Sequence, residues 1–161
     1  MLTQNEADAL ITLPKKSNSS EKYRFPYPGD ILTIPIISLD EHEKFLIDVN
    51  RGSIRFSKCT YQERYQQMFI LIRLDVDGPP HSNPEVVNVP LSILEPFNGK
   101  VIECPHLHLY VEGFMDKWAI PAPDTEFNRI DFLYQTLQDF FRYCNILEPP
   151  NVHWSQTLNE L

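Results

Sequence analysis

The segment from Cys104 to Gly113 carries the densest set of acid/base groups in the chain. It alternates polar and apolar residues, and a strand turns successive side chains to opposite faces. One face is therefore expected to be apolar and to pack on a core. The other face would carry His106, His108, Tyr110 and Glu112. Packing alone does not require so many titratable groups on one short strand.

Two further segments are predicted to add polar groups to this face. In the predicted strand 68–76, Arg73 and Asp75 alternate with an apolar set, and in the predicted strand 53–60, Arg55 does the same. If these strands neighbour the histidine strand, the polar groups meet on one side of the sheet. The candidate substrate-binding residues are Arg55, Lys58, Arg64 and His81.

The residue types fit the cleavage of RNA without a metal ion or other cofactor. Such cleavage needs a base for the 2'-hydroxyl, an acid for the leaving oxygen and a cation for the phosphate. His106 and His108 would share the acid and base roles, because the unperturbed pKa of histidine is about 6.5. Arg73 would hold the phosphate, and Tyr110 or Glu112 would orient an imidazole or supply another base.

Two alternatives stay open for the same residues. The outer face of an antiparallel sheet is normally polar, so these side chains can be ordinary surface residues. Alternatively, a His-x-His pair on a strand can direct two imidazoles at one zinc ion, with Cys104 or His81 as the third ligand.

Alternation and helical periodicity predict an α+β domain with an antiparallel sheet of about five strands. Thr3 and Glu6 fit a capping box, which indicates a short N-terminal helix. Residues 15–20 are expected to form a loop, and 61–65 a linker between two strands. Apolar residues at three- and four-residue steps predict a long C-terminal helix over 128–143, packed on one face of the sheet. They are Phe127, Ile130, Tyr134, Leu137, Phe141 and Cys144.

The length of 161 residues is typical of a single domain. Within it, residues 82–104 break the strand pattern and are expected to form a surface arm, and 151–161 a tail. The strand-to-strand connections are too short for crossover helices, which favours antiparallel pairing.

Composition limits the classes of function. The formal net charge of -8 argues against a broad electrostatic grip on nucleic acid. The chain has no apolar run long enough for a membrane span and no signal-peptide pattern at its start, so a cytoplasmic protein without membrane contact is expected. Three widely spaced cysteines predict reduced thiols rather than disulfides.

The stretches 58–65, 71–84 and 104–110 resemble a bacterial family known as a domain of unknown function. The second contains Arg-Leu-Asp-Val-Asp-Gly-Pro-Pro-His-Ser-Asn-Pro, and the third is Cys-Pro-His-Leu-His-Leu-Tyr. The resemblance covers residues 2–146, although 86–103 is longer here than the family pattern, which leaves the role of the arm open. It implies a bacterial or phage-borne cytosolic protein and supplies no catalytic residue.

Two functions follow as hypotheses. The first is a metal-independent endoribonuclease, as in the toxin of a toxin-antitoxin or phage-defence pair, with RNA as its substrate. The second is a non-catalytic acidic binding or inhibitor protein that contacts a protein partner encoded nearby. The net charge of -8 favours the second, because an acidic surface can steer onto a basic partner.

Overall fold

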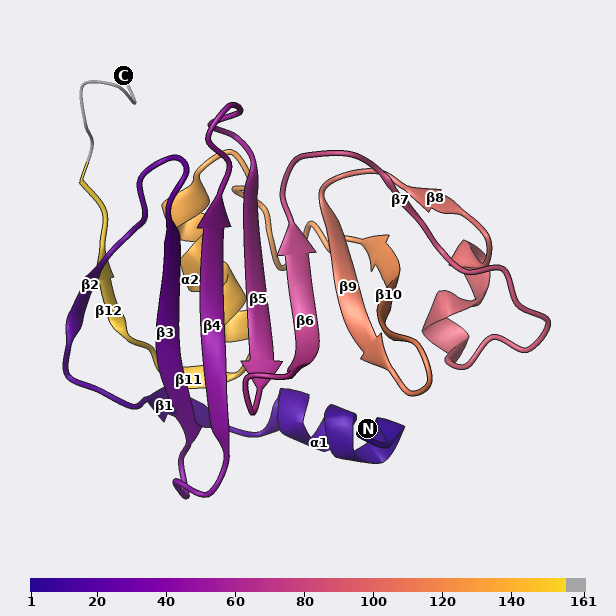
Figure 1. The fold of residues 1–161 in the computed structure, drawn as a ribbon, viewed down its shortest axis with the longest axis horizontal. Helices are drawn as coiled ribbons and strands as arrows, with labels where there is room; N and C mark the ends of the chain where they lie inside the picture. Colours follow the sequence, from indigo (N-terminus) through magenta and orange to yellow (C-terminus); the bar gives the residue numbers. More distant parts are fainter. Residues whose placement is uncertain (156–161) are drawn as a thin grey trace.

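A large, mostly antiparallel sheet organises the computed structural model, which describes residues 1–155 (Figure 1). Within this range the main sheet has eight strands in the order β10-β9-β6-β5-β4-β3-β1-β11. Its strands are β1 (Lys15–Ser17), β3 (Ile31–Ser38), β4 (Lys44–Arg51), β5 (Cys59–Tyr65), β6 (Phe69–Asp75), β9 (His106–Val111), β10 (Met115–Pro121) and β11 (Ile146–Glu148). Neighbouring strands pair antiparallel except β1 and β11, which are parallel.

The α+β class and the antiparallel sheet are confirmed, but the prediction of about five strands is wrong. Residues 15–17 and 61–65, expected as a loop and a linker, are sheet strands. Conversely, most of the predicted strand 53–60 is a closed loop. Gly52 donates its N–H to Lys58 O and Lys58 donates to Arg55 O, so the backbone turns back on itself. A side chain on Gly52 would approach Lys58 Cβ to 3.0 Å, which explains the glycine.

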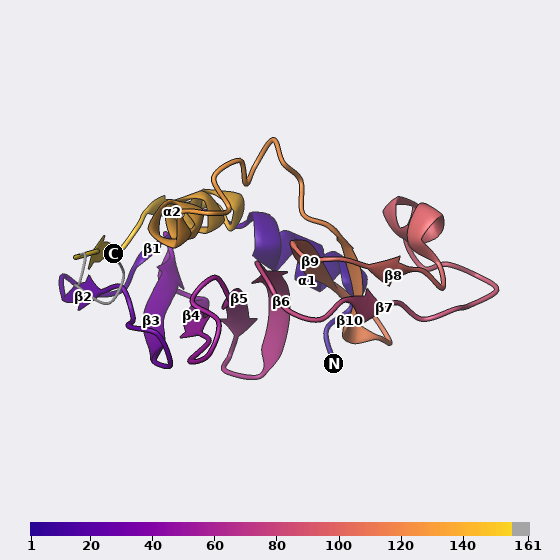
Figure 2. The same ribbon diagram turned by 90° about the horizontal axis from the view of Figure 1, so that it is seen from above.

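Helix α2 (Leu133–Tyr143) covers one face of the sheet (Figure 2). Phe140 and Phe141 are buried, and the Phe140 ring lies 5.9 Å from that of Tyr61 on β5. The predicted packing is therefore confirmed, but the helix is short: it begins at Leu133 rather than near residue 128. The Thr136 hydroxyl bonds the carbonyls of Arg129 and Phe132 and secures the turn before the helix.

Shorter elements complete the described chain. The strands β2 (Lys22–Arg24) and β12 (Asn151–His153) pair in parallel, so the predicted tail begins with a strand; residues 156–161 lie outside the described residues. The strands β7 (His81–Ser82) and β8 (Val101–Ile102) pair antiparallel and enclose the 3-10 helix η1 (Ser92–Phe97). We call residues 81–102 the arm; they project beside β9 and β10 in both views (Figures 1 and 2).

Helix α1 (Gln4–Thr12) runs across one end of the sheet (Figure 1). Its predicted capping box is present: Thr3 Oγ1 accepts from Glu6 N at 3.1 Å, and Glu6 Oε2 accepts from Thr3 N at 2.8 Å. These bonds satisfy two amide groups that a helix start leaves without intrahelical partners.

Replacing Thr3 by alanine should lower the free energy of unfolding by about 0.5–2 kcal/mol, because one cap bond is lost. Urea denaturation followed by circular dichroism measures the change. Thr12→Ala is the matched control, since Thr12 is exposed and its hydroxyl bonds only carbonyls of its own helix. A loss no larger than that of the control would show that the cap does not stabilise α1.

Candidate functional site: a buried histidine, aspartate and arginine cluster

Strands β6 and β9 are direct neighbours and bring four of the polar residues together. Their register pairs Arg73 with His108 and Asp75 with His106. Tyr61 on β5 points to α2, because its hydroxyl donates to Leu133 O at 2.7 Å. The alternate residues of β5 and their partners in β6 and β9 therefore occupy the opposite face, which we call the open face.

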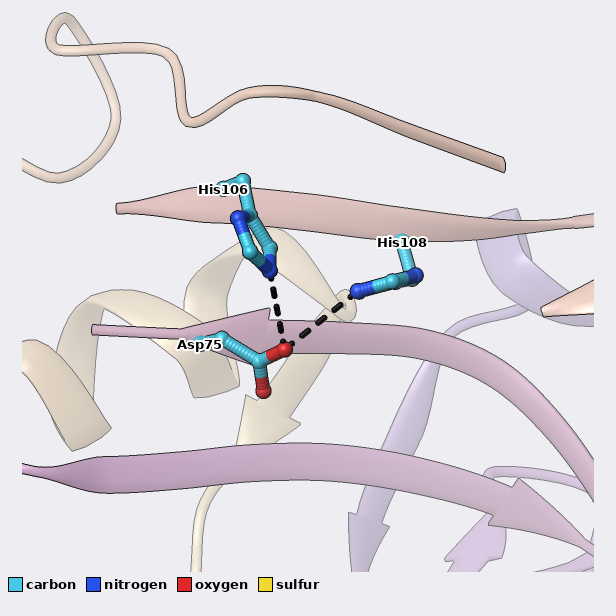
Figure 3. Close-up of side chains that lie close together, drawn as sticks. All are labelled: Asp75, His106 and His108. Atoms are coloured by element: carbon cyan, nitrogen blue, oxygen red, sulfur yellow. Dashed lines mark hydrogen bonds and ion pairs between the residues drawn. The ribbon is translucent and has the colours of Figure 1, made fainter. Parts of the chain in front are cut away.

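One carboxylate oxygen lies close to both imidazoles. His106 Nε2 lies 3.0 Å and His108 Nε2 lies 3.3 Å from Asp75 Oδ2 (Figure 3). Burial would raise the pKa of Asp75, but the hydrogen bond from His106 and the charge of Arg73 outweigh it. They hold this pKa well below its usual range, so Asp75 is ionised.

The other ring nitrogens are held by backbone carbonyls. His106 Nδ1 lies 3.1 Å from Ile102 O, and His108 Nδ1 lies 2.9 Å from Asp116 O. A carbonyl oxygen only accepts hydrogen bonds, so both Nδ1 atoms must carry a proton. This fixes the orientation of both rings and turns both Nε2 atoms toward Asp75.

Arg73 completes the cluster and distinguishes the two histidines. Its Nη2 lies 2.9 Å from His108 Nε2, and its Nη1 donates to Asp116 Oδ2 at 2.9 Å. Arginine only donates, so His108 Nε2 accepts from Arg73. His106 Nε2 faces a carboxylate oxygen, which only accepts, so this nitrogen donates to Asp75.

The arm covers the histidines. The His81 ring lies with its centroid 4.5 Å from that of His108, and its Nε2 lies 2.7 Å from Lys117 O on β10. The Asn83 amide donates to Ala119 O and accepts from Ala119 N, both at 2.8 Å. It therefore satisfies the backbone hydrogen-bonding groups of Ala119 at the outer edge of β10. His106 and His108 are only 2% and 1% exposed as a result. They are not surface residues of a polar sheet face.

The cluster reaches solvent through a groove on the open face. Arg73 and Asp75 border a hollow of about 370 Å³, next to a second one of about 390 Å³ that shares three lining residues with it. We call the two hollows the groove. Its lining comprises Ile31, Thr33, Asp48, Asn50, Lys58, Thr60, Gln62, Arg64, Arg73, Asp75, Asp77, Gly78, Pro79 and Cys104.

The remaining predicted catalytic residues contact α1 instead. The Tyr110 hydroxyl donates to Leu2 O at 2.8 Å, and Glu112 Oε2 accepts from Gln4 N at 2.9 Å. Both residues therefore hold the start of α1 against the sheet, although alternation placed them in phase with the histidines.

The predicted substrate-binding residues lie at different distances from the cluster. Lys58 and Arg64 line the groove, and His81 contacts the histidines from the arm. Arg55 lies in the loop after β4 and pairs with Asp77 at 2.7 Å. Arg64 pairs with Asp48 at 2.5 Å, so both of these arginines have a carboxylate partner.

The sequence analysis did not identify Asp116 and Asn83 as neighbours of the site, and it did not identify Asp75 as the centre of the cluster. Asp75 was placed on the polar face through its spacing from Arg73, but nothing in the sequence marked it as the partner of both histidines. Asp116 and Asn83 come from β10 and the arm, whose positions depend on tertiary packing.

Fold and site together define an α+β protein in which a cluster of two buried histidines, one partly exposed aspartate and one partly exposed arginine opens onto a polar groove. The chain belongs to a family of unknown function (DUF6978), whose model matches residues 2–146. No curated protein and no solved structure matches the chain. No helix in residues 1–155 combines the length and apolar character that crossing a bilayer requires.

Proposed function

We propose that the protein is an endoribonuclease that acts in the groove and needs no metal ion. The observation that supports this proposal most is the position of Arg73, which bonds His108 Nε2 and also borders the groove. A phosphate that enters the groove can bind the Arg73 guanidinium and so draw it away from His108. The imidazole then has a free lone pair next to the bound phosphate.

The four groups can carry out each proton transfer of RNA cleavage. His108 Nε2 takes the proton of the 2'-hydroxyl, whose oxygen attacks the adjacent phosphorus. The bond from phosphorus to the 5' oxygen breaks, and His106 gives that oxygen the proton it shares with Asp75. Arg73 stabilises the negative charge on the phosphate oxygens. The products are a 2',3'-cyclic phosphate and a 5'-hydroxyl.

The test incubates total RNA in excess chelator with the wild-type protein and the His106→Ala and His108→Ala variants. A positioned acid or base contributes about 10² to 10⁴ in rate, so each variant should lose most cleavage. His42→Ala is the matched control, because His42 is 83% exposed in the turn between β3 and β4. Circular dichroism verifies folding. No cleavage by the wild type, or equal cleavage by all proteins, would end the proposal.

A second candidate is a non-catalytic acidic binding protein with a protein partner. Arg55, Arg64 and Arg73 are each paired with a carboxylate, which favours this candidate. Because these cations are already neutralised, they can attract the phosphates of RNA only locally. Co-purification with the product of a neighbouring gene, without cleavage of any RNA, would select this candidate. Binding that survives reversal of several acidic surface residues would contradict its electrostatic basis.

A further inference from the structure

We infer that Asp75, His106 and His108 bind one zinc ion, and that bound zinc blocks the cleavage proposed above. The binding half rests only on the geometry of these three residues, whereas the inhibitory half rests on the proposed function. Each of the three residues offers one ligand atom, and these atoms all lie within 4.8 Å of one another. In residues 1–155 no other group of three such side chains meets this condition.

The distances within the cluster match those around a zinc ion. Zinc bonds of about 2.0–2.1 Å at the tetrahedral angle place neighbouring ligand atoms about 3.3 Å apart. The two imidazole nitrogens lie 3.0 and 3.3 Å from Asp75 Oδ2. Two imidazoles and one carboxylate also favour zinc over magnesium or calcium, which prefer oxygen ligands.

The surroundings of the histidines are those of metal ligands. A metal-binding imidazole usually donates its second ring N–H to a carbonyl or carboxylate, which fixes the ring. Ile102 O and Asp116 O do this for His106 and His108. Both side chains are at least 98% buried and direct Nε2 at Asp75, so they lose little conformational freedom when an ion binds.

Arg73 competes with the ion. Its Nη2 occupies the lone pair of His108 at 2.9 Å, and its charge repels a divalent cation. Zinc binding therefore requires Arg73 to leave His108 and keep its bond to Asp116, and the adjoining groove gives the guanidinium room to move. Loss of the Arg73 charge should consequently tighten zinc binding.

Zinc binding and acid/base catalysis exclude each other at this site. The ion would bind both Nε2 atoms and release the Nε2 proton of His106 to solvent, and the same two atoms must take and give protons during RNA cleavage. Zinc at ten times its dissociation constant should leave about one tenth of the protein free by mass action. Cleavage should therefore slow about tenfold at that concentration.

The binding test uses equilibrium dialysis of the full chain against zinc sulfate, with bound metal measured by elemental analysis. The wild type should bind one zinc ion per chain, and magnesium should not displace it. The double variant His106→Ala/His108→Ala should lose this ion. The matched control His42→Ala/His153→Ala removes two exposed histidines and should keep it. Asp75→Asn provides a second loss variant, and circular dichroism confirms that each protein is folded.

Arg73→Met sharpens the test, because it should bind zinc more tightly than the wild type while it loses RNA cleavage. Substoichiometric zinc in the wild type, equal loss in the control, or weaker binding by Arg73→Met would overturn the site. Cleavage that continues unchanged in saturating zinc would overturn the inhibition. A wild type that binds zinc but cleaves no RNA in chelator would refute the proposed function and leave the zinc site established.

Discussion

Replacing Lys15 by methionine should lower the free energy of unfolding by about 3–5 kcal/mol, the usual cost of breaking a buried ion pair. Lys15 on β1 and Glu63 on β5 have fully buried side chains, and Lys15 Nζ lies 3.3 Å from Glu63 Oε1. The ammonium group also donates to Ile11 O and Cys144 O. Methionine fills a similar volume but leaves the carboxylate and both carbonyls without this donor.

The double variant Lys15→Met/Glu63→Met should recover most of this loss. Two apolar side chains of similar volume need no counter-charge, and such replacements are often neutral or stabilising. Lys16→Met is the control, because the Lys16 side chain is 30% exposed and lies 3.8 Å from the mostly exposed Glu41. Chemical denaturation of the wild type and these three variants measures their free energies of unfolding. A double variant no more stable than Lys15→Met would show that the cost does not come from the unpaired carboxylate.

The Lys15→Met variant should also gain stability, relative to the wild type, as the pH falls. Burial raises the pKa of Glu63, and the Lys15 charge now limits that rise. Without Lys15 the pKa of Glu63 rises further above the unfolded value of about 4.3. A carboxyl group with a raised folded-state pKa stabilises fully below its unfolded pKa, and this contribution is lost as the pH rises through the folded pKa. Denaturation at pH 5 and pH 7 measures the difference.

The same ion pair explains why β1 and β5 were not predicted. Sequence patterns identify a strand by apolar residues at every second position. In β5 the inward residues are Tyr61, Glu63 and Tyr65, and the charged central residue interrupts that pattern. In β1 the inward residue is Lys15 itself. Each charge is tolerated only because the other is 3.3 Å away, and a contact over 48 positions cannot be read from local sequence.

Local patterns did predict the central part of the site. Strict alternation in β6 and β9 placed Arg73, Asp75, His106 and His108 on one face, and the strand pairing confirms this. The burial of the histidines could not be predicted, because it depends on how residues 81–102 fold back over β9 and β10. The same limitation applies to α2: its apolar spacing extends back to Phe127, but the chain turns at Arg129 and Phe132 before the helix begins.

Replacing Arg73 by alanine should reduce the catalytic efficiency of RNA cleavage by about 10²–10³, the usual effect of losing one donor to developing charge. Arg73 is the cation that touches both the groove and His108, so its loss should lower kcat more than it raises KM. Added guanidinium ion should restore part of the rate, since it can occupy the space that the side chain leaves.

Arg64→Ala is the matched control for this experiment. Arg64 also lines the groove, but it bonds Asp48 through Nε and Nη2 and has no contact with the histidines. Its removal should change KM slightly, leave kcat near the wild-type value and give no response to guanidinium. Steady-state kinetics on a short single-stranded RNA measures both variants. Equal losses would mean that Arg73 acts only as part of a general cationic surface. A kcat for Arg73→Ala close to the wild-type value would remove Arg73 from the reaction, because the proposed release of His108 depends on this guanidinium.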